Sequence, residues 1–315
     1  MKLRLVLFLS VCLLSLAACG SAADRSTPKD DGLIKVVATT NIVGDVVSQV
    51  GGQLIDLTVL IPPGADPHSF QPTPQDMARV VDAQVIFING AGLETFMQAL
   101  LENSGSQARQ VEVSAGIQLL EASAHDDHDE DEAHSEEDEH AGDPHVWMDP
   151  NNVLVWVDRI EEALVEMDPE NAVLYRENAA AYRQELTSLD AWIVAQINQI
   201  PQENRKLVTD HQLFVYFAER YGFEQVGAII PGYSTLSEPS AMELARLEDA
   251  IRDLGVRAIL VGNTVNPALA QRVANDTGTQ LVFFYTGSLT GADGPAATYL
   301  DYMRFNVNAI VEALK

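Results

Sequence analysis

The chain has 315 residues, of which 47% are apolar, and this is enough to bury the core of one large or two modest domains. Its formal net charge at pH 7 is −27, which argues against nucleic-acid binding because that function needs a basic face. An acidic surface instead suits a ligand or partner that carries positive charge.

The N-terminal segment has the features of an export signal. Lys2 and Arg4 precede an apolar run that is too short to span a bilayer comfortably. The run ends in Leu-Ala-Ala-Cys, which resembles the bacterial lipobox, in which Cys19 is lipidated and becomes the new N-terminus; a signal peptide cleaved nearby is the alternative. We therefore expect a signal peptide at residues 1–18 and a flexible tether at residues 19–32, and hence an exported protein, lipid-anchored at the outer face of the cytoplasmic membrane or in the periplasm.

Strand and helix patterns alternate between residues 33 and 105. Short apolar runs predict buried strands, and apolar residues spaced by three and four predict helices. The predicted strands are residues 33–39, 55–61 and 84–90, and the predicted helices are residues 42–51, 73–83 and 93–105. Thr73 as N-cap and Pro74 at the first helical position support the second helix. The alternation indicates a parallel sheet covered on both faces.

A loop rich in histidine and acidic residues follows at residues 122–143. Five of the seven histidines of the chain lie between residues 125 and 150. A segment this charged cannot bury a core, so a solvated, disordered loop is one interpretation. The other is an accessory metal collector that binds zinc weakly and raises its local concentration. The accessory ligands would be His125, His128, His134 and His140.

A helix is predicted at residues 149–167, and a second, much longer helix follows Pro169. Its apolar positions recur at spacings of three and four over about 30 residues, so it is about 45 Å long and could bridge two lobes. These positions are Tyr175, Ala179, Tyr182, Leu186, Leu189, Ile193, Ile197 and Ile200.

The alternation of strands and helices resumes after Pro201. The predicted strands are residues 206–210, 223–229, 256–262 and 279–285, and the predicted helices are residues 213–222, 237–255, 267–278 and a last helix from about 296. Ser240 and Glu243 fit a capping box, with Gly255 as the stop. We predict an α/β fold of two Rossmann-like lobes with mostly parallel sheets, joined by one long rigid helix, with a metal site in the cleft. The lobes would be residues 33–167 and 201–315, with residues 168–200 as the linking helix.

Only three histidines lie outside the acidic loop. His68, His145 and His211 each follow a strand or begin a helix, at the sheet ends where open α/β folds place ligands. A lone histidine near a loop is usually an ordinary surface or core residue, but three at comparable sheet ends indicate a shared site. Neutral imidazole suits zinc, copper, nickel or iron.

Five motifs together resemble the zinc/manganese substrate-binding lipoproteins of bacterial ABC importers. They are LIPPGADPHSFQPTPQD, DPHVWMDP, VTDHQLFVYFAERYGF, SEPSAMELARL and the tail TYLDYMRFNVNAIVEAL. The resemblance covers residue 33 to the C-terminus together with the lipobox. It implies two α/β lobes, a rigid linking helix and one divalent metal between the lobes, bound by His68, His145 and His211.

The fourth ligand departs from the family pattern. Where the resemblance implies an acidic residue after the last strand, this chain has Gly287. Asp293 is a tentative replacement, Glu238 is another loop carboxylate, and a water or a group from the acidic loop is a further alternative. Three imidazoles with at most one carboxylate favour Zn²⁺, whereas Mn²⁺ is the alternative cargo and prefers oxygen donors.

The predicted function is capture of zinc and delivery to an ABC permease, by a monomeric protein that is no enzyme. A zinc hydrolase would need an open coordination position and a nearby general base, and Asp210 is the only carboxylate adjacent in sequence to one of the three histidines. No HExxH motif occurs. A surface lipoprotein that buffers metal or mediates adhesion is the other alternative.

Overall fold

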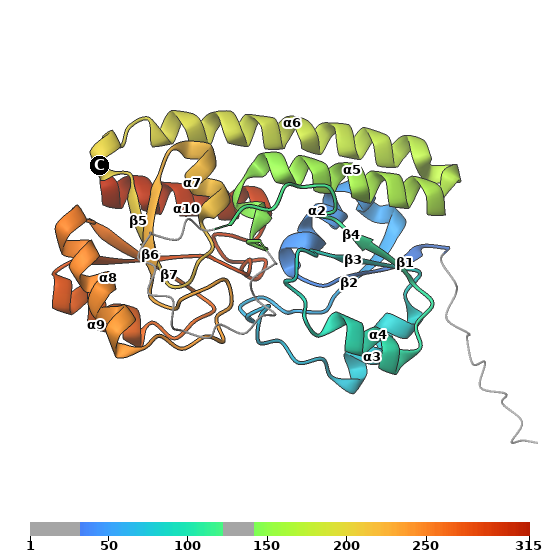
Figure 1. Ribbon diagram of the computed structural model, residues 1–315. Helices are drawn as coiled ribbons and strands as arrows, with labels where there is room; N and C mark the ends of the chain where they lie inside the picture. Colours follow the sequence, from blue (N-terminus) through green and yellow to red (C-terminus); the bar gives the residue numbers. More distant parts are fainter. Residues whose placement is uncertain (1–31, 122–141) are drawn as a thin grey trace, which may run out of the picture. The chain divides into compact units, whose positions relative to one another are not determined.

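The computed structural model describes residues 32–121 and 142–315 (Figure 1). The predictions for the signal peptide, Cys19 and the tether lie outside the described residues, as do those for His125, His128, His134 and His140. The residues from Ile34 to Lys315 form one compact unit that contains two four-stranded sheets. All strand pairs in both sheets are parallel, and the predicted α/β two-lobe fold is confirmed.

The first lobe is built on the sheet β2-β1-β3-β4. Its strands are β1 (Ile34–Ala38), β2 (Ile55–Val59), β3 (Val85–Ile88) and β4 (Arg109–Glu112), and its helices are α2 (Asn41–Gly51), α3 (Pro74–Asp82) and α4 (Met97–Ser104). Thr73 caps α3 as predicted, in a capping box with Asp76. Strand β4 was missed by the sequence prediction. It lies at the sheet edge with three of its four residues exposed, so it carries no apolar run.

The second lobe repeats this topology in the sheet β6-β5-β7-β8. Its strands are β5 (Lys206–Thr209), β6 (Glu224–Ala228), β7 (Ala258–Gly262) and β8 (Gln280–Phe284), and its helices are α7 (Val215–Tyr221), α8 (Ala241–Leu254), α9 (Ala268–Thr277) and α10 (Tyr299–Leu314). The capping box of Ser240 and Glu243 at the start of α8 is confirmed, and Gly255 ends this helix in the left-handed region.

Two helices separate the lobes in sequence, α5 (Pro150–Met167) and α6 (Ala172–Ile197). Helix α6 has 26 residues, fewer than the predicted 30, because a short 3₁₀ turn at Pro169–Asn171 precedes it. Every apolar position predicted to form its buried stripe is buried. Helix α6 packs against α5 and α2 toward one of its ends and against α10 toward the other, so it spans both lobes (Figure 1).

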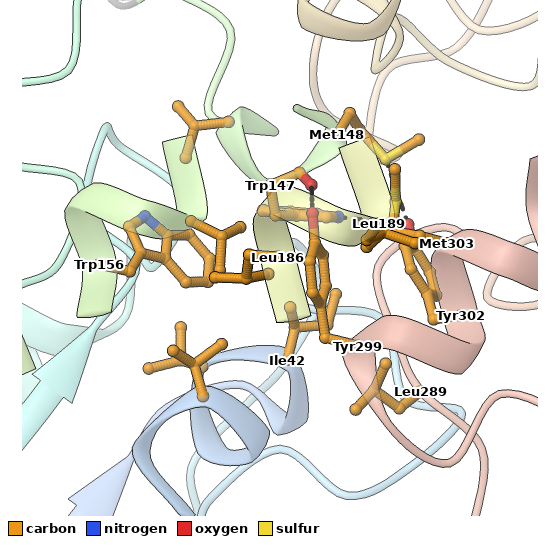
Figure 2. Packing of buried hydrophobic residues seen from close by; sticks show 14 of the residues in the cluster. Ile42, Trp147, Met148, Trp156, Leu186, Leu189, Leu289, Tyr299, Tyr302 and Met303 are labelled. Carbon is orange, nitrogen blue, oxygen red and sulfur yellow. Dashed lines mark hydrogen bonds between the residues drawn. The ribbon is translucent and has the colours of Figure 1, made fainter. Parts of the chain in front are cut away.

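One apolar cluster extends from the first lobe into the second. Figure 2 shows its centre, where Trp147 and Trp156 pack against side chains of α6 and α10. The Tyr299 hydroxyl donates a hydrogen bond to the Trp147 carbonyl oxygen over 2.7 Å. This shared core anchors the segment that follows His145. None of the helices in the described part of the chain is long and apolar enough to cross a membrane.

Candidate metal centre

The structure brings His68, His145 and His211 together. His68 lies in the loop after β2, His145 immediately before the 3₁₀ turn Val146–Met148, and His211 two residues after β5. The Nε2 atom of His145 lies 3.1 Å from that of His68 and 3.3 Å from that of His211. Over residues 32–121 and 142–315, this is the one group of potential metal ligands whose atoms all lie within 4.8 Å of one another. It draws on both lobes.

His145 is buried and held by Asp143. One carboxylate oxygen, Oδ1, accepts the backbone N–H of His145 over 2.8 Å and lies 2.6 Å from its Nδ1. The histidine side chain is almost fully buried, and its ring packs edge-on against Trp147 with 5.2 Å between centroids. Burial raises the pKa of Asp143 to about 7. Because Oδ1 already accepts the amide, it acts as acceptor toward Nδ1 as well.

His211 is held in the same way by Asp210. Oδ1 of Asp210 accepts the backbone N–H of His211 over 2.7 Å and lies 2.7 Å from its Nδ1. The other oxygen accepts the backbone N–H of Gly262, at the end of β7, over 2.6 Å. Asp210 therefore ties the histidine to two neighbouring strands of the second sheet.

These two carboxylates determine the tautomers of the two rings. A carboxylate that accepts from Nδ1 keeps the proton on that nitrogen, so Nε2 carries a lone pair. When both aspartates are ionised, the Nε2 atoms of His145 and His211 face each other at 3.3 Å with their lone pairs. Two lone pairs this close repel unless a cation lies between them. Carboxylate-oriented imidazoles of this kind are the usual ligands of protein-bound transition metals.

His68 is held more loosely. Oδ1 of Asp66 accepts the backbone N–H of His68 over 3.1 Å, but the carboxylate does not bind the imidazole. The other carboxylate oxygen of Asp66 accepts hydrogen bonds from the hydroxyl groups of Ser69 and Thr235, and Thr235 belongs to the second lobe. His68 is half-buried, whereas the other two rings are enclosed.

His68 and His145 are uncharged at neutral pH. Burial, followed by the neighbouring His145 and His211, lowers the pKa of His68 from 6.5 to about 2. Burial also lowers the pKa of His145 well below its ordinary value. Since a proton and a metal ion compete for the same lone pair, these two neutral imidazoles can accept a cation without first losing protons.

A cavity of about 430 Å³ leads to the cluster from the side of His68. Residues 91–93 and Pro144 of the first lobe line it, with residues 232–234 of the second lobe opposite. Neither His145 nor His211 lines this cavity, so His68 is the ligand closest to the entrance.

The tentative fourth ligand, Asp293, is not part of the group. Two hydrogen bonds between Thr290 and Ala296 close residues 290–296 into a separate small loop, and Asp293 is exposed in it. Glu238 is also exposed and outside the group. Among the described residues, the structure therefore assembles three imidazoles without a carboxylate.

The sequence interpretation missed the positioning role of Asp143 and Asp210. Asp143 lies two residues before His145, and Asp210 directly precedes His211. The tripeptide Asp-Pro-His occurs twice, at residues 66–68 and 143–145, and this repetition was the available signal.

The fold and the site define a two-lobed protein with three convergent imidazoles between its lobes, a donor set that suits a metal ion. Comparison with known families gives a match over residues 36–313 to the family described as the periplasmic component A of zinc-uptake complexes. The chain belongs to this family of metal-binding substrate-binding proteins of ABC importers.

Individual relatives are named for several metals. The chain is 36% identical to the manganese-binding lipoprotein MntA of Halalkalibacterium halodurans, over 95% of this chain and 94% of that protein. It is 30% identical to the iron-binding protein YfeA of Yersinia pestis, over 97% and 94% of the two chains. The name of the first relative, a lipoprotein, agrees with the predicted export and lipid anchoring.

Solved structures share the fold. The periplasmic zinc-binding protein TroA of Treponema pallidum superposes with a TM-score of 0.80 at 27% identity, over 90% of this chain and 99% of TroA. A manganese-bound periplasmic metal-binding protein of Candidatus Liberibacter asiaticus gives 0.77 at 28% identity, over 89% and 99%. These relatives are described as metal-binding proteins, and the metal differs among them.

Proposed function

We propose that the chain captures zinc between its lobes and delivers it to an ABC permease. The observation that carries this proposal is the convergence of the buried Nε2 atoms of His145 and His211, 3.3 Å apart, with the Nδ1 atom of each ring held by a carboxylate. His68, which lines the cavity, adds a third imidazole whose Nε2 lies 3.1 Å from that of His145. The ion is cargo, so tight binding and controlled release matter, and no chemical step is required.

The spacing of the nitrogens fits zinc. A Zn–N bond of about 2.0–2.1 Å and a tetrahedral angle put two ligand nitrogens roughly 3.3–3.4 Å apart. The two measured separations, 3.1 and 3.3 Å, are close to this value. Three imidazoles are a nitrogen-rich set, whereas manganese prefers more oxygen donors, and this difference favours zinc. A water would then complete the tetrahedron.

Manganese is the second candidate, because relatives such as MntA are named for it. A carboxylate in the group would support it, and Asp293 and Glu238 are the candidates from the sequence. Both are exposed and outside the group, which favours zinc.

Delivery also involves attachment to the membrane, and we propose that Cys19, which lies outside the described residues, carries the lipid anchor. We further propose that residues 33–167 and 201–315 act as two lobes joined by residues 168–200, and that the protein works as a monomer. His125, His128, His134 and His140 would collect zinc weakly and raise its concentration near the cavity.

The test is a competition titration of zinc and manganese against a chromophoric chelator. The variants are His211→Ala, a deletion of residues 122–141, and His140→Ala as a matched histidine control. We expect wild type to bind one zinc tightly and in preference to manganese. His211→Ala should lose at least about 100-fold in zinc affinity, since removing a ligand costs more than the 10- to 100-fold typical of its supporting residues.

Each alternative gives a different result. Zinc binding by His211→Ala at wild-type strength would overturn the site. A preference for manganese would select the second candidate. Several zinc ions bound with similar affinity, and lost on the deletion, would indicate metal buffering rather than delivery. Turnover of esters or peptides by the zinc-loaded protein would indicate a hydrolase.

A further inference from the structure

The segment Thr286–Ser288, directly after β8 and Tyr285, contacts the first lobe although it supplies no metal ligand. All three of its residues are buried. The Ser288 hydroxyl oxygen accepts the backbone N–H of Gly64 over 2.7 Å and the side-chain amide of Asn41 over 2.9 Å. The side-chain oxygen of Asn41, Oδ1, in turn accepts the backbone N–H of Leu289. The segment is therefore bound to the loop that carries His68.

Gly287 makes the closest contact with this loop. Its φ is not positive, so its backbone does not require glycine. A Cβ placed there would lie 2.9 Å from Cδ and 3.0 Å from Cγ of Pro67, well inside the ordinary separation of about 3.5–4.0 Å between carbon atoms. The proline ring is bonded to its own backbone nitrogen, so it cannot rotate away. A side chain at 287 therefore forces either its own segment or Pro67 to shift, and Pro67 is one peptide bond from His68.

The same segment also contacts the residues that support the other two histidines. The Thr286 carbonyl oxygen accepts a hydrogen bond from Tyr302 over 2.7 Å, and the Tyr302 oxygen accepts from Trp147 Nε1, the indole packed against His145. On its other side Thr286 lies against Gly262: a Cβ on Gly262 would be 2.3 Å from Thr286 Oγ1 and 2.8 Å from Asp210 Oδ2. Asp210 holds His211.

We propose that Thr286–Ser288 is a positioning segment that determines the separation of the three Nε2 atoms, with Gly287 as its specificity-determining residue. This inference rests on the proposed function. With no side chain at 287, Pro67 packs directly on the segment, and His68 lies at the short distance from His145 that suits a small tetrahedral ion. A side chain at 287 pushes His68 outward, so zinc binds more weakly and its preference over manganese narrows.

Gly287→Ala tests this proposal, with Gly291→Ala as the matched control. Gly291 lies four residues further along the same loop, has no positive φ, and a Cβ there would meet nothing within 4 Å. We expect Gly287→Ala to lower zinc affinity by about 10- to 100-fold, the range typical of residues that orient metal ligands, and Gly291→Ala to bind as wild type. The visible absorption of bound Co²⁺ should lose intensity only in Gly287→Ala, because its tetrahedral geometry is distorted.

A second variant shows whether the contact with Pro67 is the cause. Pro67→Ala removes both atoms that a Cβ at 287 would meet, so Pro67→Ala/Gly287→Ala should recover zinc affinity relative to Gly287→Ala. The metal-free melting temperature is measured for each variant. Should Gly287→Ala fail to fold, the double variant must regain both fold and zinc binding for the proposal to stand.

The failure of this inference is distinguishable from that of the proposed function. A wild-type chain that binds no zinc would overturn the proposed function. A wild-type chain that binds zinc while Gly287→Ala binds it equally well would overturn only the positioning role. A folded double variant that binds as weakly as Gly287→Ala would also overturn it.

Discussion

Two Asp-Pro-His segments, residues 66–68 and 143–145, have the same sequence and different environments. In the second, Asp143 accepts both the backbone and the ring N–H of His145, and the whole segment is buried. In the first, Asp66 accepts only the backbone N–H of His68 and directs its other oxygen to Thr235 of the opposite lobe. One segment is a rigid part of the core, and the other is a contact between lobes.

The difference indicates how an ion could enter and leave. His145 and His211, each oriented by a carboxylate, form a preorganised pair, and preorganisation lowers the cost of binding. His68 borders the cavity, and its ring is not held by a carboxylate. An ion would therefore meet His68 first, and the buried pair would then complete its coordination shell.

The largest effect should come from removing a ligand of the rigid pair. We expect His145→Ala to lower zinc affinity by at least about 100-fold, and His68→Ala to lower it by a smaller factor, because only the first disrupts the preorganised geometry. Competition titrations of both variants measure the two factors. Equal losses would break the distinction between the two Asp-Pro-His segments.

The next effect concerns the carboxylates. Asp210→Asn should lower zinc affinity by about 10- to 100-fold, because the neutral amide orients His211 less strongly and its NH₂ group can meet the Gly262 N–H. Asp293→Asn is the control, and the position of Asp293 outside the group predicts no change. If Asp293→Asn weakened binding instead, the sequence-based suggestion that Asp293 is the fourth ligand would regain support.

A smaller effect should follow from loosening the first segment. Thr235→Val keeps the side-chain shape and removes the hydrogen bond to Asp66. Since one hydrogen bond contributes about 0.5–1.5 kcal/mol, zinc should dissociate roughly two- to tenfold faster. Stopped-flow transfer of zinc to an excess of chelator measures the rate. Thr187→Val, exposed on α6, is the control, and a rate like that of wild type in Thr235→Val would show that the contact between the lobes is unimportant.

The smallest effect concerns the pH dependence of stability and the residues that support the second Asp-Pro-His segment. Glu94 is buried, accepts the backbone N–H groups of Asn89 and Gly90, and thereby holds Asn89, whose side chain donates to the Pro144 carbonyl oxygen. Burial raises the pKa of Glu94 above 4.5. The folded chain thus binds this proton more tightly than the unfolded chain, and the contribution of Glu94 to the free energy of unfolding falls as the pH rises above about 4.5.

Glu94→Gln removes this titration. Urea denaturation of the metal-free protein between pH 4.5 and 7 should show the free energy of unfolding of wild type decreasing relative to that of the variant as the pH rises. Glu102→Gln, exposed on α4, serves as the control and should run parallel to wild type. Parallel curves for Glu94→Gln would contradict the expected sign.

Much of the fold could be predicted because its signals are local. The capping boxes at Thr73 and Ser240 and the buried stripe of α6 depend on residues within a few positions of one another, and all are present in the structure. Strand β4 could not be predicted, since Arg109–Glu112 becomes a strand only by pairing with β3. The start of α6 was placed three residues too early because Pro169–Asn171 forms a 3₁₀ turn.

For the site, the sequence by itself identified the three candidate imidazoles, since His68, His145 and His211 are the only histidines outside the acidic loop. Their roles as metal ligands stay a prediction. Only the tertiary structure decided which Asp-Pro-His is anchored, where Asp293 lies, and which atoms a side chain at residue 287 would meet. The physical reason is distance along the chain: Gly287 meets Pro67, and Thr235 meets Asp66, across more than 160 residues, so no local pattern can encode either contact.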